Sequence, residues 1–526
     1  MLGARASRLA IACLTIGAFA IRVSNFRQGL FGDEFSTAWV VEGRGLGRVL
    51  SIVHSDAEVT PPLSFVLSWL TAKIGSGHEW LRLPSLVAGT VTIPLIYAVG
   101  RQLVSRTAGL VAAAAVTLSP MMIYYSTEAR AYALMVAFLA GSTLAMLTAL
   151  RGSRRRWWVV YGGLSCLALY SHYTAAFPLA AQLLWLLWAH PGARVPAILA
   201  NVGAAVAYVP WIPGYVADTK SVTIPLVNVL FPLNFHAARL AVEQWALGYP
   251  YVTVRQVPGI ALASLIVAGI ALAGAGALGR VLVGARRSGE PVARSLARIP
   301  RAAVLVAALA LSAPVGEAIY SAVGTHVLGT RNLNASWPGL ALAIGALVAA
   351  APRALGVVSC ALVLVGYGGG AVKSLESRWA RPDYPGVASF IDAHAGPRDV
   401  VVDGAVLPAV VPLTGPDAYL RRAHREFRPG LPKGPPPYTF FTPVPPVAPL
   451  LAQAIRDARG ARIFLVAALA PTQAGSGRLG DQLAHHPLGE AGALLSRLPP
   501  GYRIVETRVF VGLEPLGVLV ISTHAR

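Results

Sequence analysis

The dominant pattern in the chain is a series of long apolar segments separated by short segments that contain arginine. A membrane-spanning helix needs about 20 mainly apolar residues. Segments of this kind lie at residues 7–24, 82–101, 107–125, 128–149, 157–172, 173–190, 194–213, 258–284, 300–321, 333–350 and 353–372. The apolar stretch at residues 61–74 is shorter, so we expect it to be re-entrant or interfacial. The pattern predicts an all-α polytopic membrane domain over residues 1–376, with about 11 transmembrane helices.

Residues 377–526 have a different pattern, with more proline and shorter apolar runs. Periodicity predicts helices at residues 383–394 and 450–459, and short apolar runs predict strands at 399–403 and 461–467. Residues 503–512 and 517–523 are expected to form a closing hairpin, and the proline-rich residues 429–449 are expected to be irregular. This part of the chain is therefore predicted to be a small α/β domain.

Composition agrees with a membrane protein. The 526 residues are 55% hydrophobic and 13% charged, whereas a soluble domain averages about 25% charged residues. The net charge of +21 would suggest nucleic acid as a partner of a soluble protein. Here the arginines lie between apolar segments, so the positive-inside rule explains most of them and no nucleic-acid partner is expected. Cys13, Cys166 and Cys360 lie inside apolar segments and have no metal-ligand spacing.

The arginines also predict the orientation. They gather at residues 5–8, 101–106, 151–156, 194, 280–301 and 353, which fall on one side of the membrane when the spans are counted. We therefore expect the N-terminus to be cytoplasmic and the domain at residues 377–526 to be extracytoplasmic. The first apolar segment is expected to be retained as a span rather than removed as a signal peptide.

This orientation gathers polar residues on the outer side. They are Asp33, Glu34, His54, Asp56 and Glu58 in the first outer loop, Glu128, Arg130 and Tyr132 in the next, then His172, His326 and Arg331. Each alone has a plain explanation: acidic residues suit a helix N-terminus, and the others suit interface anchors or salt bridges. Their convergence on one face favours a functional site, because ionisable groups near the apolar boundary are costly.

Several of these residues stand in motifs that occur in order. The motifs are Asp33-Glu34, the Asp56-to-Leu63 stretch ending in Pro-Pro-Leu, Leu81-Arg82-Leu83-Pro84-Ser85 and Glu128-Ala129-Arg130-Ala131-Tyr132. They resemble the bacterial glycosyltransferases related to protein O-mannosyltransferases, which belong to the GT-C superfamily, in particular the Rgt-like lipopolysaccharide branch. The resemblance is best over residues 20–215. The family usually has histidine before Pro-Pro-Leu, where this chain has Thr60, and the later motif is altered to Arg331-Asn332-Leu333.

The resemblance implies an inverting glycosyltransferase. It would move one sugar from a polyprenyl-phosphate donor to a hydroxyl of a glycan, lipid or protein acceptor, at the outer face of the bacterial cytoplasmic membrane. Asp33 would be the general base and Glu34 would orient the acceptor or the base. Arg130 and Arg331 suit the donor phosphate, and His172 is a further candidate. His54, Asp56, Glu58, Glu128 and Tyr132 are other candidate site residues.

No cofactor is expected. Asp33, Glu34, Asp56 and Glu58 are carboxylates that suit a divalent metal ion, but we do not favour a metal site. The alternative function is a transporter or flippase of a lipid-linked envelope precursor, whose polar residues would lie at mid-membrane. Residues 107–118 and 134–148 are almost free of charge, which disfavours it. A non-catalytic membrane scaffold is a third possibility, and it gives no reason for the clustered charges.

Overall fold

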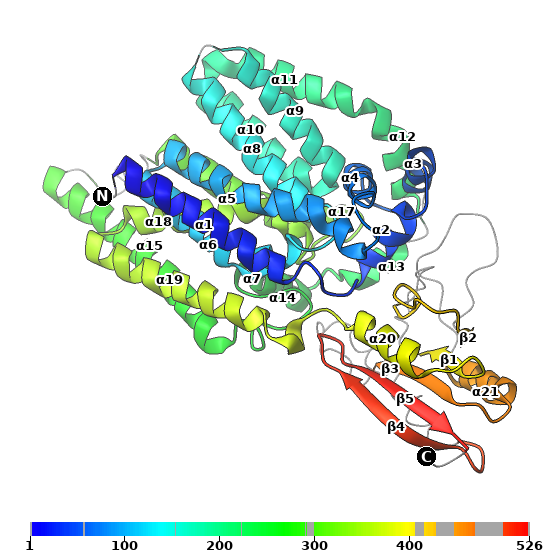
Figure 1. The fold of residues 1–526 in the computed structure, drawn as a ribbon. Coiled ribbons are helices and arrows are strands. Elements are labelled where there is room, and N and C mark those ends of the chain that lie inside the picture. Colours follow the sequence, from blue (N-terminus) through cyan, green and yellow to red (C-terminus); the bar gives the residue numbers. More distant parts are fainter. Residues whose placement is uncertain are drawn as a thin grey trace.

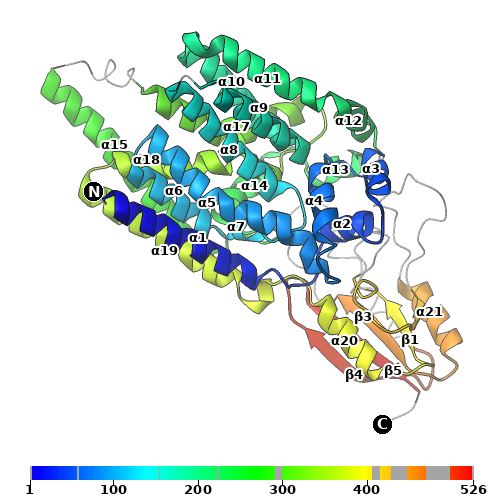
Figure 2. The same ribbon diagram turned by 45° about the horizontal axis from the view of Figure 1, so that its top comes forward.

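The computed structural model describes residues 3–55, 58–152, 154–221, 224–289, 291, 299–404, 415–427, 447–468 and 498–523. It consists of a bundle of long helices with a small sheet at one end (Figure 1). The N-terminus lies at the end of the bundle that is remote from the sheet, and the views of Figures 1 and 2 agree on this. The first span therefore runs toward the sheet, and the residues that follow it lie between bundle and sheet.

The bundle is built from long apolar helices. They are α1 (Ala4–Ser24), α5 (Leu83–Leu103), α6 (Arg106–Leu118), α8 (Tyr132–Arg151), α9 (Arg156–Ser171), α10 (Ala176–Ala189), α11 (Arg194–Tyr208), α15 (Ile260–Ser288), α17 (Arg301–Val323), α18 (Trp337–Ala350) and α19 (Arg353–Ser374). In the described chain, eight stretches are long and apolar enough to cross a membrane, judged by length and composition. The protein is thus a multi-pass membrane protein, while the predicted number of about 11 spans stays a prediction.

The apolar segment predicted at residues 107–125 is not one helix. Helix α6 ends at Leu118, and α7 (Pro120–Tyr125) begins after Ser119, whose hydroxyl accepts a hydrogen bond from the backbone of Met122. Pro120 stands at the first position of α7, where its missing N–H costs nothing and its ring ends the preceding helix. The break turns the chain toward the polar residues 126–131.

Small residues let the central helices approach closely. A Cβ atom on Gly100 of α5 would lie 2.6 Å from the Cα of Gly109 of α6, and one on Gly345 of α18 would lie 2.2 Å from the Ala108 carbonyl oxygen. Such contacts are typical of helices packed in a membrane, where close van der Waals packing drives association. In both views α5 and α6 lie between α8–α11 on one side and α15 and α19 on the other (Figures 1 and 2).

Short helices cover the end of the bundle that faces the sheet. They are α2 (Asp33–Val41), α3 (Leu46–His54), α4 (Leu63–Thr71), the 3-10 helix η1 (His78–Arg82), α7, α12 (Ile212–Thr219), α13 (Ile224–Leu230), α14 (Phe235–Leu247) and the 3-10 helix η5 (Asn332–Ser336). Helix α4 has 9 residues and is too short to cross a membrane, in agreement with the expectation for residues 61–74.

The C-terminal part contains a sheet with the strand order β2-β1-β3-β5-β4. Its elements are α20 (Tyr384–His394), β1 (Val400–Asp403), β2 (Arg425–Phe427), α21 (Val447–Ala458), β3 (Ile463–Ala468), β4 (Arg503–Phe510) and β5 (Leu516–Ser522). Strand β1 is parallel to β2 and β3, and β5 is antiparallel to β3 and β4. The predicted helices, strands and closing hairpin are confirmed. Strand β2 was not predicted, and residues 429–446 lie outside the described residues.

The sheet domain shares a hydrophobic core with the short helices of the membrane part. Phe35 of α2 and Val49 of α3 belong to one buried cluster with Ile391 of α20 and Val401 of β1. On the other face of the sheet, α21 packs on a separate cluster. The shared core holds the sheet against α2, whose first residue is Asp33. The predicted division of the chain at residue 377 stays a prediction.

Candidate active site

Asp33 and Glu34 form the first turn of α2. The preceding Gly32 has a φ of 55°, which favours glycine, and the carbonyls of Phe31 and Gly32 accept the backbone N–H groups of Glu34 and Phe35 at 3.2 Å. The positive end of the helix dipole lies at these two carboxylates, as the plain helix-start explanation expects. Asp33 and Glu34 also bind guanidinium groups, and each carboxylate binds a different pair of arginines. A position at the start of a helix does not by itself account for these ion pairs.

Asp33 lies between two arginines. Nη1 of Arg331 donates to Asp33 Oδ2 at 2.6 Å, and Nη2 of Arg130 lies 3.9 Å from the same oxygen. The Asp33 side chain is 37% exposed, whereas that of Arg130 is 8% exposed. Partial burial works against the charged form of Asp33, but the charges of Arg331 and Arg130 outweigh it and lower its pKa. Asp33 is therefore an ionised, accessible carboxylate at neutral pH.

Arg130 is held by a second carboxylate. Its Nη1 donates to Glu58 Oε2 at 3.4 Å, its Nη2 donates to Thr60 Oγ1 at 3.1 Å, and the hydroxyl of Ser36 donates to Glu58. Thr60 thus has a partner in the site although it departs from the family pattern. Burial raises the pKa of Glu58 to about 7, the charge of Arg130 opposes this rise, and nearby Asp33 adds to it.

Glu34 lies in a separate, fully buried ion cluster. Arg82 binds it through two parallel bonds, from Nε to Oε1 and from Nη2 to Oε2, both of 2.6 Å. The backbone N–H of Ala129 also donates to Oε1 at 2.8 Å, and Nε of Arg381 lies 3.3 Å from Oε2. Burial disfavours the charged carboxylate, but Arg82 and Arg381 outweigh it and lower the pKa of Glu34. Glu34 is 0% exposed, so its carboxylate has no contact with solvent in this structure, unlike that of Asp33.

Arg82 ties this cluster to the backbone after the first span. Its Nη1 donates to the carbonyls of Phe26 and Gln28, and its Nη2 donates to the carbonyl of Gly29. A guanidinium group with several carbonyl partners and a bidentate carboxylate fixes the path of residues 26–34. The sequence motif at residues 81–85 contained Arg82, but nothing in the sequence indicated which residue it would bind.

Glu128 is buried beside these charges. In the part of the chain that the structure describes, its Oε2 accepts no hydrogen bond. Burial, together with the negative charges of Glu34 and Asp33, raises the pKa of Glu128 to about 8 against the opposing charge of Arg381. Glu128 is therefore mostly protonated at neutral pH, which distinguishes it from Asp33.

His172 lies close to the two arginines of the Asp33 group. Its Nδ1 lies 3.3 Å from the backbone N of Thr174 and 2.9 Å from the hydroxyl oxygen of the same residue. Burial, and then the charges of Arg331 and Arg130, lower the pKa of His172 to about 3. Its ring centroid is 5.1 Å from that of Tyr132. The structure thus places a neutral His172 beside Tyr132.

Two candidates are not joined to this group. His54 is exposed on α3, and its ring contacts Trp211 edge-on at 5.7 Å. Asp56 lies outside the described residues. Among the described residues no group of three or more His, Cys, Asp or Glu side chains suits a metal ion. A metal shared by Asp33, Glu34, Asp56 and Glu58 stays untested, since Asp56 is not described.

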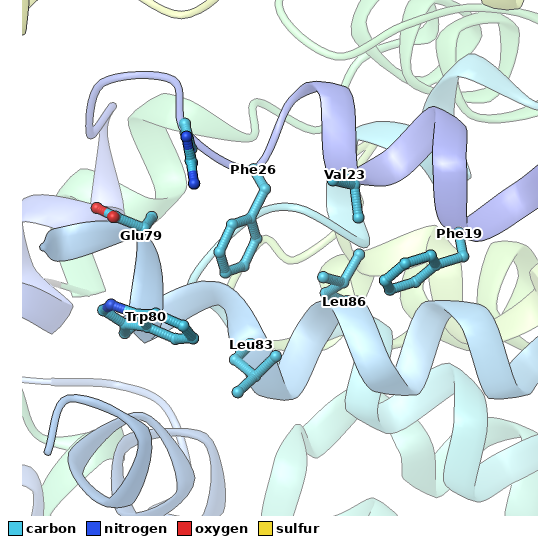
Figure 3. A pocket seen from close by; sticks show the side chains of 8 residues that line it. Phe19, Val23, Phe26, Glu79, Trp80, Leu83 and Leu86 are labelled. Atoms are coloured by element: carbon cyan, nitrogen blue, oxygen red, sulfur yellow. The ribbon is translucent and has the colours of Figure 1, made fainter. Parts of the chain in front are cut away.

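An apolar pocket lies between the end of α1 and the start of α5 (Figure 3). It is lined by Phe19, Val23, Phe26, Arg27, Glu79, Trp80, Leu83 and Leu86. The rings of Phe26 and Trp80 meet edge-on at 6.3 Å. The carbonyl of Phe26 accepts the hydrogen bond from Arg82, so the pocket adjoins the residue that binds Glu34.

Comparison with known proteins agrees with this architecture. Residues 59–214 match the model of the family described as dolichyl-phosphate-mannose-protein mannosyltransferase. The chain is similar to ArnT from Cupriavidus metallidurans bound to undecaprenyl phosphate, with 14% identity, 98% of each chain covered and a TM-score of 0.51. The apo state of that protein gives 14% identity, covers 98% of this chain and 97% of that chain, and has a TM-score of 0.50. No curated protein matches the chain in sequence.

The likeness shows a shared fold: the chain has the fold of ArnT from Cupriavidus metallidurans, with a small C-terminal sheet region. The matched residues 59–214 contain Thr60, Arg82, Glu128, Arg130 and His172. The segment that matches this family model therefore supplies Arg82, Glu128 and Arg130, whereas Glu58, Arg331 and Arg381 lie outside it.

Proposed function

We propose that the protein is an inverting glycosyltransferase that moves a single sugar from a polyprenyl-phosphate donor to a hydroxyl acceptor. The observation that carries the proposal is the pairing of an ionised, partly exposed carboxylate, Asp33, with the guanidinium groups of Arg331 and Arg130. The reaction needs a base and a phosphate-binding group on opposite sides of the anomeric carbon, because inversion requires attack from the side opposite the leaving phosphate. The direct contact between Asp33 and Arg331 would therefore open to admit the sugar. The matched family and the shared fold support this choice.

The reaction has one chemical step. The acceptor hydroxyl oxygen bonds to the anomeric carbon, the bond from that carbon to the phosphate oxygen breaks, and the hydroxyl proton passes to Asp33. The electron pair leaves with the polyprenyl phosphate. Inversion needs one base, unlike the two carboxylates of a retaining hydrolase. Arg331 and Arg130 stabilise the charge that develops on the leaving phosphate, because guanidinium binds phosphate oxygens through paired hydrogen bonds.

Donor binding would also adjust the base. In the present arrangement the hydrogen bond from Arg331 helps to keep the pKa of Asp33 low. When a donor phosphate accepts hydrogen bonds from that guanidinium group, the ionised form of Asp33 loses some of its stabilisation. The pKa of Asp33 then rises and the carboxylate becomes a stronger base. The neutral His172 suits a hydrogen bond to the phosphate or to a sugar hydroxyl. We therefore expect the base to be strongest when the donor is in place.

The pocket of Figure 3 suits part of the isoprenoid chain. Phe19, Val23, Leu83 and Leu86 offer an apolar lining on helices long enough to cross a membrane. ArnT was crystallised with undecaprenyl phosphate, which is a lipid of this class. The proposed location is the outer face of the bacterial cytoplasmic membrane, with the C-terminal domain outside, as the arginine distribution predicts.

A transporter or flippase of a lipid-linked envelope precursor remains the alternative, since the same cations suit a lipid phosphate. The two functions differ in product. The purified protein should release free polyprenyl phosphate from a polyprenyl-phosphate sugar when an envelope extract supplies acceptors. Movement of the intact lipid across a vesicle bilayer, with no sugar released, would favour the alternative instead.

A further inference from the structure

Arg381 belongs to the segment between α19 and α20, yet its side chain enters the membrane part and is 3% exposed. Its Nε lies 3.3 Å from Glu34 Oε2, its Nη1 lies 3.5 Å from Thr127 Oγ1, and its guanidinium carbon stands 4.4 Å above the ring of Tyr124. Arg381 thus reaches the acidic motif from a part of the chain that the family match at residues 59–214 does not include.

The C-terminal domain holds Arg381 in this position. The backbone N–H of Leu513, in the turn between β4 and β5, donates to the carbonyl of Ala380 at 2.7 Å. The backbone N–H of Arg381 donates to Gln28 Oε1 at 3.1 Å. A Cβ atom on Gly512 would lie 3.2 Å from the carbonyl oxygen of Arg381, so only glycine fits that turn without displacement. The hairpin turn and residues 25–30 therefore fix the backbone of Arg381 from two sides.

The bonding of Arg381 is incomplete for a buried charge. Within the described residues its Nε and Nη2 have no hydrogen-bond partner, so its contact with Glu34 is an ion pair without a hydrogen bond. Oε2 of Glu128 also has no partner among these residues. Arg82 already satisfies both oxygens of Glu34. A second buried cation beside one carboxylate is costly to desolvate and adds little to stability, so its position at the acidic motif favours a contribution other than stability.

We propose that Arg381 is a positioning residue for glycosyl transfer, so that the C-terminal domain completes the active site. The inference rests on the proposed function. Arg381 and Arg82 hold the carboxylate of Glu34 from two sides, and Glu34 is the neighbour of Asp33 in the first turn of α2. Fixing Glu34 fixes the start of that helix and so the distance from Asp33 to Arg331. A displacement of about 1 Å at a reacting group can cost roughly 100-fold in rate.

The test compares Arg381→Gln and Arg381→Lys with Arg378→Gln in the full-length protein. Arg378 is a matched control three residues earlier, since it is exposed, pairs with Glu376 and lies over the ring of the adjacent Trp379. We expect Arg381→Gln to lower kcat by about 10- to 100-fold with little change in the donor KM. Arg381→Lys should recover part of the activity, and Arg378→Gln should behave like the parent. Parental kcat in Arg381→Gln would overturn the inference.

Two further readouts separate positioning from loss of folding. If Arg381 acts through Glu34, the double variant Arg381→Gln/Glu34→Gln should lose no more activity than Glu34→Gln alone. The acid limb of the pH profile of kcat/KM should also move to higher pH in Arg381→Gln, because Asp33 would lose part of its contact with Arg331. Additive losses with an unmoved limb would contradict positioning. If Arg381→Gln fails to fold, the comparison of single and double variants is made with Arg381→Lys and Glu34→Gln.

Failure of the inference about Arg381 can be distinguished from failure of the proposed function. A parent protein without any transfer activity would end the proposed function. An active parent with an equally active Arg381→Gln variant would end only the role of Arg381.

Discussion

Arg331 and Asp33 stand 298 positions apart in the chain, and Nη1 of the arginine donates to Oδ2 of the aspartate at 2.6 Å. The contact joins the start of α2 to the segment before η5. It brings a candidate base and a candidate phosphate-binding group within one hydrogen bond of each other. Most of the expected chemistry of the protein depends on this pair.

The first prediction concerns Arg331. Lysine would keep the charge but lose the planar guanidinium group, so Arg331→Lys should bind polyprenyl phosphate about 10- to 100-fold more weakly. The affinity of the purified protein for polyprenyl phosphate measures this. Arg239→Lys is the control, because Arg239 is exposed and pairs with Glu243 on the same helix. Equal affinities of Arg331→Lys and the parent would place the phosphate elsewhere.

Glu128 is the competing carboxylate, and its protonation distinguishes it. Because burial raises its pKa to about 8, Glu128 is mostly neutral at pH 7 and a neutral amide resembles it in shape and charge. Glu128→Gln should therefore keep most of the transfer activity at pH 7, measured as sugar transferred per minute. A loss as large as that of an Asp33 variant would instead identify Glu128 as the base.

Glu58 predicts a pH dependence of stability. Burial raises its pKa from 4.5 to about 7, so between these values the folded protein holds a proton that the unfolded chain has released. Stability should then fall as pH rises from 4.5 to 7 and change little above. In Glu58→Gln this fall should be smaller, as the thermal midpoint in detergent at pH 5 and pH 7.5 would show. Glu243→Gln, at an exposed ion pair, serves as the control.

The apolar pocket gives a prediction about donor length. Leu86→Trp would place a larger ring in the space that Figure 3 shows beside Phe19 and Val23. The KM for a long polyprenyl-phosphate sugar should rise several-fold, while that for a short-chain analogue should change little. Val159→Trp, on an exposed position of α9, is the matched control. Equal changes for both donor lengths would exclude the pocket as a chain site.

The fold was largely predictable because it depends on local patterns. Long apolar segments indicate spans, and the continuous β-branched run Val400-Val401-Val402 indicates a strand whose two faces are both buried. The break at Ser119 and Pro120 was missed, since the apolar run continues through it. Strand β2 was missed because its three residues carry no periodic signal.

The site was predictable only in part. The motifs and the arginine distribution placed Asp33, Arg130 and Arg331 on one side of the membrane. The partners of each carboxylate could not be read from the sequence, because they depend on how distant segments pack. Arg381 carries no local signal in a proline- and arginine-containing segment, and its place beside Glu34 follows from the docking of the C-terminal hairpin.

Asp33→Asn tests the central claim most directly. Gly32 is the N-cap of α2 and Asp33 is its first helical residue, so the amide variant leaves the cap unchanged and α2 should be retained. The amide cannot accept the acceptor proton as a carboxylate does, and general base catalysis is worth roughly 10²- to 10⁴-fold. Transfer from a polyprenyl-phosphate sugar should fall by that amount, while expression and donor binding stay close to those of the parent. Near-parental transfer by Asp33→Asn would contradict the assignment of Asp33 as the base.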